Sequence, residues 1–455
     1  MGKKRILIFG TSPLPEENPD RLTCPEIRTG IFVNYLKHDF EICLIAIREF
    51  PMIENGEIID KFYTEEFGFK YYSLNKIHFR KHEMVRKIAR DFNPDVILGI
   101  NSFPSFYAAT LGIDVPVWVD LNGSMMMEGQ LKAYKENIPD LTSKFWKIEK
   151  AILQRADKFS VVSRPQKFEL IGELGGIGRL NKLNSGYEFI EIIPEPVLDY
   201  IKPVFRRENL DLFKPDDFVI FWMGGFNYWT DVDFLFKVLE RAMIKNPKIK
   251  FLSIGGNIFG QKTQKQEKLI TLINQSSFKD NFKIIGWVKT DEVEKYVLAC
   301  NFGINIDNNS YETLIGARYR IIEMLRLGLP ILSTKGSEIT EIVNKQGLGL
   351  VSPIGDTERF VENILTASKL NREEYKKLSS KCKDFVNQQF SPKVLLKPLK
   401  TWINNPACSP DHNQVANYNR TKAVIKKLHT FFKLIYHPAD FFRILKRKLA
   451  AFLNG

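Results

Sequence analysis

Short, continuously apolar runs rich in β-branched residues alternate with helical patterns through the first half of this sequence, and this alternation constrains the fold most strongly. Strands that are apolar at every position, and not only at every second one, are typical of a parallel sheet buried on both faces. The helices between them would cover those faces, so the pattern predicts a doubly wound α/β domain. The predicted strands are residues 5–9, 41–47, 95–100, 115–121 and 158–162.

The same alternation restarts at Phe218 and predicts a second doubly wound domain. Between the two patterns, residues 181–216 contain a proline-rich extended stretch and charged patches, which are typical of an interdomain connection. Two such domains in tandem leave a cleft between the carboxyl ends of their strands, where ligands bind. The strands predicted for the second domain are residues 218–222, 249–255, 282–288, 302–307, 329–333 and 348–351.

The predicted organisation has six parts, and helical segments that follow the second domain are expected to reach back toward the first. A polar, turn-rich stretch then reads as a linker before the last, strongly basic segment. The parts are a first doubly wound domain (1–195), a connection (196–216), a second doubly wound domain (217–390), a crossing helix (391–405), a linker (406–421) and a basic amphipathic tail (422–455).

Composition and length favour a packed globular protein of more than one domain. The 455 residues exceed what one core usually holds, and 44% of them are hydrophobic. No apolar run reaches the roughly 18 residues of a membrane span, and the N-terminal apolar run, residues 6–9, is too short for a secretory signal. Five widely spaced cysteines predict a reduced, cytoplasmic protein with neither a zinc site nor disulfides.

The formal net charge of +13 is concentrated at the C-terminal end of the chain. Residues 421–455 hold eight lysines and arginines against one acid, Asp440, which gives +7 in this segment. The remainder is only mildly basic, so we expect no nucleic-acid partner. Phenylalanines and leucines among these cations predict two short amphipathic helices that bind the anionic inner face of the cell membrane. The alternative is a helical pair that packs on the body of the protein.

Residues 311–334 combine a glycine-containing loop, two arginines, a short amphipathic helix and a buried strand. Free backbone N–H groups at a helix N-terminus attract anions, and Arg318 and Arg320 would add bidentate phosphate recognition. Glu323, further along the same helix, would hold the hydroxyl pair of a sugar. From Gly316 onward this segment therefore predicts a site for the diphosphate and ribose of a nucleotide. The alternative is an ordinary βαβ connection with surface arginines.

A second loop, after the first predicted strand of the second domain, contributes Gly224, Gly225 and Asn227. Glycines at this position would let a phosphate or sugar approach the backbone closely, which a Cβ would prevent. Asp231 and Asp233 have the spacing of a metal-chelating Asp-x-Asp, but they begin a helix, where Asp231 is better explained as an N-cap. Because the six histidines are also scattered, the sequence predicts no metal site.

Several pieces of the sequence, taken in order and over residues 4–405, resemble the family-four-like GT-B glycosyltransferases. This resemblance implies that the second domain binds a sugar nucleotide, that the first binds the acceptor, and that no cofactor beyond the donor is needed. The pieces are CPEIRTGIFVNYL, VWVDLNGSMMMEGQLKA, the Ser-Arg-Pro-Gln stretch at 163–166 with Gly-Arg-Leu-Asn at 178–181, Ile-Pro-Glu-Pro at 193–196, MGGFNYWTDVD and GARYRIIEMLRLGLPILST.

In this family's usual pattern, two glutamates flank seven residues of the donor domain. Glu323 matches the second, whose implied role is to hold the ribose hydroxyls; the alternative is a solvated helix acid. The first glutamate would fall at Ile315, and Glu312 lies three positions earlier. We expect Arg318 and Arg320 to compensate as phosphate clamps for this missing carboxylate.

The resemblance also implies sites for the base and the acceptor. The backbone near Trp287 and Val288 would recognise the base, although a core position is the alternative for Trp287. Asp120 and Asn122 end a predicted strand at the cleft, where Asp120 would contact the acceptor or the transferred sugar, the alternative being a turn or cap residue. Further first-domain candidates are Glu128 and Arg28, which opens the first helix.

The sequence therefore predicts metal-independent transfer of a sugar from a nucleotide-diphosphate sugar to a saccharide or lipid-linked acceptor. The pathway would be cell-surface polysaccharide or glycolipid synthesis, with retention of anomeric configuration as is usual in the family. The candidate catalytic residues are Asp120, Arg320 and Glu323. Two alternatives remain: a sugar-nucleotide isomerase of the same architecture, and a non-catalytic, membrane-attached sugar-nucleotide-binding protein, which the loss of the family's glutamate at Ile315 would suit.

Overall fold

The continuously apolar runs of the first half form a mostly parallel sheet that is buried on both faces, as predicted. The computed structural model describes residues 2–17, 19, 21–48, 52–54, 57–64, 66–197, 212–258 and 264–413. In this part of the chain the first sheet has the order β10-β9-β8-β7-β1-β2-β6-β5, and β5 runs antiparallel to β6. The first-domain strands are β1 (Arg5–Ser12), β2 (Glu41–Arg48), β3 (Met52–Glu54), β4 (Glu57–Ile59), β5 (Lys61–Tyr63), β6 (Lys70–Asn75), β7 (Val96–Ile100), β8 (Val117–Leu121), β9 (Lys158–Val161) and β10 (Ile190–Ile192).

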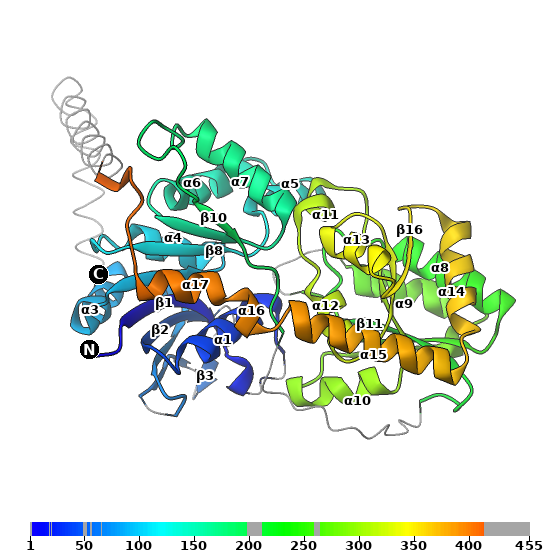
Figure 1. Ribbon diagram of the computed structural model, residues 1–455. Coiled ribbons are helices and arrows are strands. Elements are labelled where there is room, and N and C mark those ends of the chain that lie inside the picture. Colours follow the sequence, from blue (N-terminus) through cyan, green and yellow to red (C-terminus); the bar gives the residue numbers. More distant parts are fainter. Residues whose placement is uncertain are drawn as a thin grey trace, which may run out of the picture.

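Helices cover both faces of this sheet (Figure 1). Apolar side chains of the first and last helices of the described chain fill one face, and those of the intervening helices fill the other. The helices that pack on the first sheet are α1 (Cys24–Leu36), α2 (Lys76–Phe79), α3 (His82–Phe92), α4 (Ser102–Thr110), α5 (Met125–Glu136), α6 (Leu141–Leu153), α7 (Arg164–Gly176), α16 (Pro392–Leu395) and α17 (Lys397–Asn404).

The sequence pattern predicted no strand between residues 48 and 95, yet β3 to β6 lie there. β3, β4 and β5 have three residues each, too few for a periodicity to be recognised. β6 interrupts its apolar positions with Ser73 and Asn75, which are nevertheless buried. β6 and β5 extend the first sheet beyond β2, and β3 and β4 form a separate two-stranded antiparallel sheet. None of the four contributes a residue to the cavity, so missing them does not alter the predicted site.

The second domain has a six-stranded parallel sheet in the order β13-β12-β11-β14-β15-β16, which confirms the predicted doubly wound architecture. Helices pack on both of its faces around the two clusters of buried apolar side chains. Its elements are β11 (Phe218–Met223), α8 (Val232–Lys245), β12 (Ile249–Ile254), α9 (Lys265–Gln275), β13 (Phe282–Gly286), α10 (Val293–Leu298), β14 (Phe302–Asn305), α11 (Tyr311–Ile315), α12 (Tyr319–Arg326), β15 (Ile331–Thr334), α13 (Glu338–Lys345), β16 (Gly349–Ser352), α14 (Thr357–Ser368) and α15 (Arg372–Gln389).

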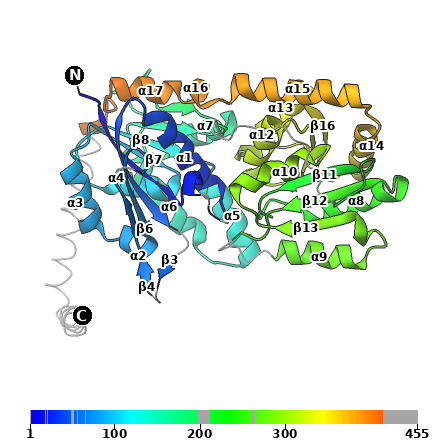
Figure 2. The ribbon, with the colours of Figure 1, turned by 90° about the horizontal axis from the view of Figure 1, so that it is seen from below.

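After α15 the chain returns to the first domain through α16 and α17, which run along one side of both domains (Figure 2). Leu396, Leu399 and Ile403 are fully buried there in the core of the first domain. Trp402 packs edge-on against Trp118 of β8, with ring centroids 5.4 Å apart. The predicted basic tail, residues 422–455, lies outside the described residues. Among the described helices, none combines the length and the hydrophobicity that a membrane span requires.

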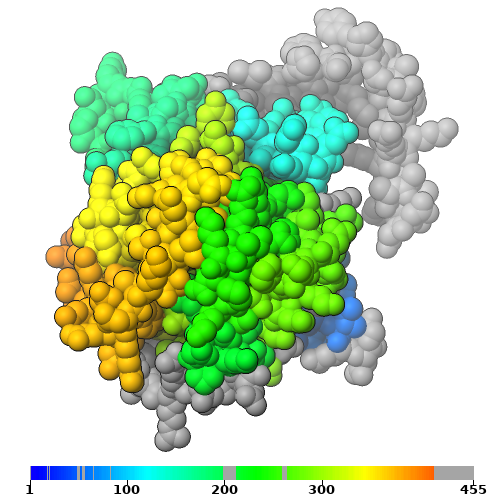
Figure 3. Space-filling model, turned by 90° about the vertical axis from the view of Figure 1, so that its right-hand side faces the viewer, coloured from blue at the N-terminus to red at the C-terminus, as the bar shows by residue number. Residues whose placement is uncertain are grey.

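Polar contacts join the domains directly across the cleft. Ser163 Oγ donates to the carbonyl of Ile315 at 2.6 Å, and the backbone N–H of Arg164 donates to Glu338 Oε2 at 2.9 Å. Helix α11 therefore contacts both α5 and α7, and Figure 3 shows this contact from the side of the second domain. The carboxyl ends of the two sheets are thereby held facing each other.

Candidate functional site

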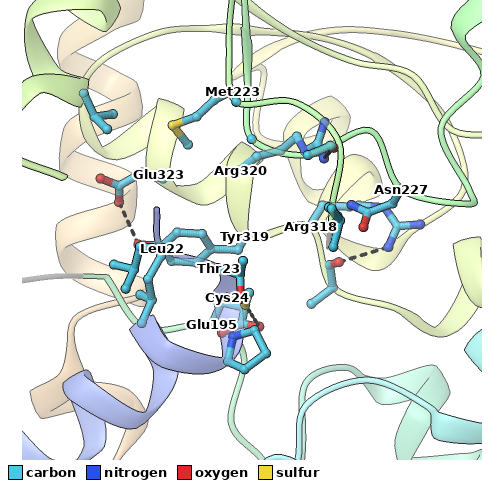
Figure 4. Close-up of a pocket in the computed structure, with 18 of the residues that line it drawn as sticks. Leu22, Thr23, Cys24, Glu195, Met223, Asn227, Arg318, Tyr319, Arg320 and Glu323 are labelled. Carbon is cyan, nitrogen blue, oxygen red and sulfur yellow. Dashed lines mark hydrogen bonds between the residues drawn. The ribbon is translucent and has the colours of Figure 1, made fainter. Parts of the chain in front are cut away.

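A cavity of about 390 Å³ lies between the two domains and is lined by residues of both (Figure 4). This volume falls in the range typical of small-molecule sites. Arg28 and Asp120 are the two predicted site residues that do not line it. The predicted residues that do are Asn122, Gly224, Gly225, Asn227, Trp287, Val288, Gly316, Arg318, Arg320 and Glu323.

The two glycines after β11 are required by backbone geometry. Gly224 has φ of +88°, a left-handed conformation that L side chains rarely adopt. A Cβ on Gly225 would come within 2.3 Å of the Ile258 side chain. The backbone conformation of these two glycines places the carbonyl of Gly225 beside the cavity, where it accepts a hydrogen bond from Arg320 Nη2 at 2.6 Å. The loop therefore positions an arginine, in addition to leaving space for a ligand.

Arg320 is a partly buried cation of this site, and no carboxylate in the described part of the chain forms an ion pair with it. Its guanidinium stacks over the Trp222 ring at 4.2 Å, and its Nη1 is buried with no hydrogen-bond partner in the described part of the protein. Burial lowers the pKa of Arg320 to about 10, and Asp307 offsets this only in part. An uncompensated buried charge is costly, and an anion beside it would remove that cost.

Arg318 is held very differently, which corrects the expectation that both arginines are phosphate clamps. Its Nε donates to Asp307 at 2.8 Å, and its Nη1 and Nη2 donate to the two oxygens of Glu312 at 3.0 and 2.8 Å. Burial alone would lower the pKa of Arg318, but Asp307 and Glu312 raise it above its ordinary value. Both carboxylates neutralise the guanidinium, so Arg318 stabilises the loop and has no spare charge for a phosphate.

Glu323 is buried, which excludes the alternative of a solvated helix acid. Arg326 donates to both of its oxygens, at 2.6 and 3.0 Å, and the Tyr319 hydroxyl lies 3.3 Å from Oε2. The carboxylate still borders the cavity together with Tyr319 and Arg326. A carboxylate has about four acceptor positions, so further hydroxyl groups can bind to it.

The aromatic wall of the cavity joins the two domains. Trp287 is partly exposed, so it is not the core aromatic that was its alternative, and its Nε1 donates to the carbonyl of Asn257 at 3.3 Å. Arg21 of the first domain stacks over the same ring at 4.5 Å and donates to the same carbonyl at 2.8 Å. A planar ligand entering here would meet residues of both domains.

Arg28 and Asp120 form a fully buried ion pair, which corrects the prediction that they face the ligand. Arg28 donates to both oxygens of Asp120, at 2.6 and 2.8 Å, and also to Glu195 and to the carbonyls of Ile193 and Pro194. The pair ties α1 and β8 to the segment that leaves the first domain. The pair therefore supports the wall of the cavity without lining it.

The first-domain wall of the cavity is made by residues that lie above this ion pair. Cys24 donates its thiol proton to Glu195 at 3.1 Å, and Asn122 contacts both Cys24 and Asn101. Burial and the nearby Glu195 raise the pKa of the Cys24 thiol well above its ordinary value. Cys24, Asn122 and Glu195 thus line the cavity with hydrogen-bonding atoms.

Glu128 of α5 reaches into the cleft from the first domain and lines the same cavity as the Glu312–Arg318 pair. Its side chain is accessible to water within the cleft, but enclosure by both domains raises the pKa of Glu128 to about 8, with a further contribution from Glu312. A carboxyl group with a pKa near neutrality can exchange protons with a substrate. No hydrogen bond fixes its oxygens in the described structure.

Several residues of the cavity were not predicted from the sequence. Arg326 and Tyr319 lie three and four positions from Glu323 on the same helix, a spacing that would have indicated their contact. Cys24 and Glu195 are 171 positions apart, and no local pattern connects them. Only the fold brings these two together.

Comparisons with known proteins agree with this geometry. Residues 217–369 match the family model described as glycosyl transferases group 1. Sucrose-phosphate synthase from Thermosynechococcus elongatus superimposes with a TM-score of 0.63 at 13% identity, covering 88% of this chain and 98% of that one. HepE from Anabaena, in complex with UDP-glucose, superimposes with a TM-score of 0.62 at 13% identity, and the alignment covers 92% of this chain and 99% of HepE. A glycosyltransferase from Rickettsia africae superimposes with a TM-score of 0.61 at 16% identity, and the alignment covers 90% of this chain and 100% of that one. A comparison with curated proteins finds no match.

The two facing doubly wound domains and the cavity between them therefore define the GT-B fold of glycosyltransferases. Residues 217–369 of the second domain match the model of the glycosyl transferases of group 1, and the expected resemblance to family-four-like GT-B enzymes is confirmed.

We predict that Asp120→Asn lowers the free energy of unfolding by about 3–5 kcal/mol, because it leaves Arg28 partly uncompensated in a buried position. Nucleotide affinity of the folded protein should change little, since Asp120 does not line the cavity. Chemical unfolding and calorimetric titration measure the two quantities. Glu41→Gln, which breaks an exposed pair with Arg5, is the control and should cost less than about 1 kcal/mol. A stable Asp120→Asn protein with weakened nucleotide binding would contradict this assignment.

Proposed function

We propose that this protein transfers a sugar from a nucleotide-diphosphate sugar to a hydroxyl group of an acceptor bound on the first domain. The observation that carries the proposal is Arg320, whose buried Nη1 has no partner among the described residues and which lies at the edge of the cavity. A diphosphate would supply the missing charge and the missing hydrogen-bond acceptors. The group 1 match of the second domain supports the same donor class.

In this proposal the two ends of α12 hold different parts of the nucleotide. Arg320, in the first turn, binds the diphosphate together with the N-terminal end of the helix dipole. Glu323, one turn further on, accepts hydrogen bonds from the ribose hydroxyls while Arg326 keeps its carboxylate oriented. The base would lie toward Trp287 and Val288. Charge that develops on the leaving diphosphate then appears where Arg320 already lies.

We further propose that no metal ion assists the leaving group. Asp231 accepts a hydrogen bond from the backbone N–H of Phe234 at 3.0 Å, as predicted for a helix N-cap. Asp233 pairs with Lys268 at 2.5 Å on the surface. Both carboxylates of the Asp-x-Asp sequence thus have roles outside the cavity, and Arg320 provides the positive charge. Retention of anomeric configuration, the usual outcome in the family, is part of the proposal.

Glu128 is our candidate for the group that receives the acceptor's proton. The carbon–oxygen bond to the diphosphate breaks, and the acceptor oxygen bonds to the same carbon on the face that the diphosphate leaves, which retains the anomeric configuration. The hydroxyl proton passes to the Glu128 carboxylate. Glu128 comes from the first domain and lines the cavity together with the Glu312–Arg318 pair. Its raised pKa makes it a stronger base than an ordinary carboxylate once it is ionised.

The acceptor is proposed to be a saccharide or a lipid-linked saccharide of cell-surface polysaccharide or glycolipid synthesis. Support for a membrane acceptor comes from the sequence of residues 422–455, where basic residues alternate with phenylalanines and leucines. Neither alternative function, an isomerase or a binding protein without activity, is favoured by a specific contact in the described structure.

The first test concerns Arg320. We predict that Arg320→Ala weakens binding of UDP or GDP by about 10- to 100-fold, because a charge-assisted hydrogen bond to a buried anion contributes about 1.5–3 kcal/mol. Isothermal titration with both nucleotides measures this loss. Arg241→Ala, which removes an exposed arginine of the same domain, is the matched control and should bind like the unmodified protein. Equal affinity in all three proteins would place the diphosphate elsewhere.

The second test is the pH dependence of transfer. Because the base is the ionised form and the pKa of Glu128 is about 8, kcat should rise with pH and level off above this value. Glu128→Gln should lower kcat by about 100-fold or more and abolish the rise, with unchanged affinity for the nucleotide. The exposed Glu341→Gln serves as the control. A rise that persists in Glu128→Gln would show that another group accepts the proton.

The third test is membrane binding. The intact protein should sediment with vesicles that contain anionic phospholipid and remain in solution with vesicles of phosphatidylcholine, since each lysine or arginine near an anionic surface contributes about 1 kcal/mol. Deleting residues 422–455 should abolish sedimentation and leave nucleotide affinity unchanged. Sedimentation of the shortened protein with anionic vesicles, or equal sedimentation of the intact protein with both kinds of vesicle, would contradict a role for this segment.

A further inference from the structure

A second group of chemically active side chains lies at the amino ends of the strands of the first sheet, on the side away from the cavity. Asp157 immediately precedes β9, at the amino end of the strand, whereas the cavity lies at the carboxyl ends. The chain segment 405–413, which follows α17, folds over these strand ends and brings Cys408 and His412 beside Asp157. One ligand atom of each of these three residues lies within 4.8 Å of the other two.

His412 is held between two carboxylates. Its Nδ1 lies 2.9 Å from Asp157 Oδ1, and its Nε2 lies 3.1 Å from Asp114 Oδ1. A neutral imidazole has one N–H, so if Nε2 donates to Asp114, the lone pair of Nδ1 faces an anionic oxygen. A metal ion beside Nδ1 would accept this lone pair and at the same time neutralise the Asp157 oxygen.

We propose that Asp157, Cys408 and His412 bind a zinc ion, and that Asp114 orients His412 from behind. A carboxylate that accepts the second N–H of a metal-binding histidine is the usual support of such sites, since it fixes the tautomer that offers the other nitrogen to the metal. Thiolate, imidazole and carboxylate together suit Zn²⁺, with water completing four-fold coordination. Zn²⁺ binds nitrogen and oxygen at about 2.0–2.2 Å, which is compatible with an Nδ1 to Oδ1 separation near 3 Å.

The alternative use of a cysteine beside a histidine and an aspartate is nucleophilic catalysis. Asp114 argues for metal binding instead, because a carboxylate behind His412 is the usual support of a metal-binding histidine. Zinc displaces the thiol proton of Cys408 to solvent as the Zn–S bond forms, which makes metal binding pH-dependent. No redox step or further reactant is involved.

Asp157 is positioned for this role independently of the metal. Its Oδ2 accepts from the backbone N–H of Val117 and from Arg155, so the carboxylate is fixed at the sheet edge. Ser409 donates both its N–H and its hydroxyl to Oδ1, and Arg179 pairs with Asp411 at 3.1 Å. The segment is thus already seated on the first domain, and zinc would lock it there. The widely spaced cysteines predicted no zinc site, because only the fold joins Cys408 and His412 to Asp157.

The test uses the full chain, exposed to zinc and freed of excess metal by gel filtration. We expect about one zinc per chain by elemental analysis, and an affinity, measured by competition with a chromogenic chelator, that falls as pH is lowered and protons compete for His412 and Cys408. Cys408→Ser and His412→Ala should each weaken binding by more than about 100-fold, and Asp114→Ala by about 10- to 100-fold. Asp157 is left unchanged because its other hydrogen bonds support the fold.

Two further measurements keep the proposal falsifiable. Cobalt substituted for zinc should give a thiolate charge-transfer absorption that Cys408→Ser abolishes and that His38→Ala, an exposed histidine elsewhere, retains. The proposal fails if the intact protein holds no stoichiometric zinc, or if Cys408→Ser and His412→Ala retain it with full affinity. In either case the cluster only joins residues 405–413 to the first domain by hydrogen bonds.

Discussion

The pairing of buried arginines with carboxylates is the constraint on which this structure depends. A charge removed from water is costly unless an opposite charge and hydrogen bonds compensate it. Arg28 is compensated by Asp120 and Glu195, and Arg318 by Asp307 and Glu312. The Arg28 set joins elements that are distant in sequence, and the Arg318 set fixes the loop between α11 and α12, so the pairs that satisfy these charges also fix the walls of the cavity.

Arg320 is the exception among these arginines, and the exception explains the function proposed for the cavity. It makes one hydrogen bond to a backbone carbonyl and stacks on Trp222, but no carboxylate within the described residues pairs with it. Its lowered pKa measures the cost of that environment. A site that has a residual positive charge before the ligand arrives has the electrostatic preorganisation that a leaving diphosphate needs.

The fold was predictable from the sequence because continuous apolar strands leave few alternatives to a doubly wound sheet. Part of the cavity was predictable for a similar reason: Gly224 directly follows β11, and Gly316 and Glu323 lie in the loop and helix that follow β14, on the side where such sheets bind ligands. What the sequence does not reveal is the direction of a charged side chain. Asp120 and Arg318 lie at positions in the chain where ligand-binding residues are expected, yet the side chains of both form ion pairs with buried partners.

The loss of the family's first glutamate at Ile315 has a consistent explanation within the proposed function. The nearest acid of the same domain, Glu312, has both oxygens engaged by Arg318. A carboxylate that faces the donor must then come from the other domain, and Glu128 is the first-domain acid that lines the cavity beside this pair. Glu128 approaches the donor residues only because α11 contacts α5 across the cleft. The proton-accepting group and the diphosphate-binding arginine are therefore assembled by apposition of the two domains, so an isolated donor domain would bind nucleotide without catalysing transfer.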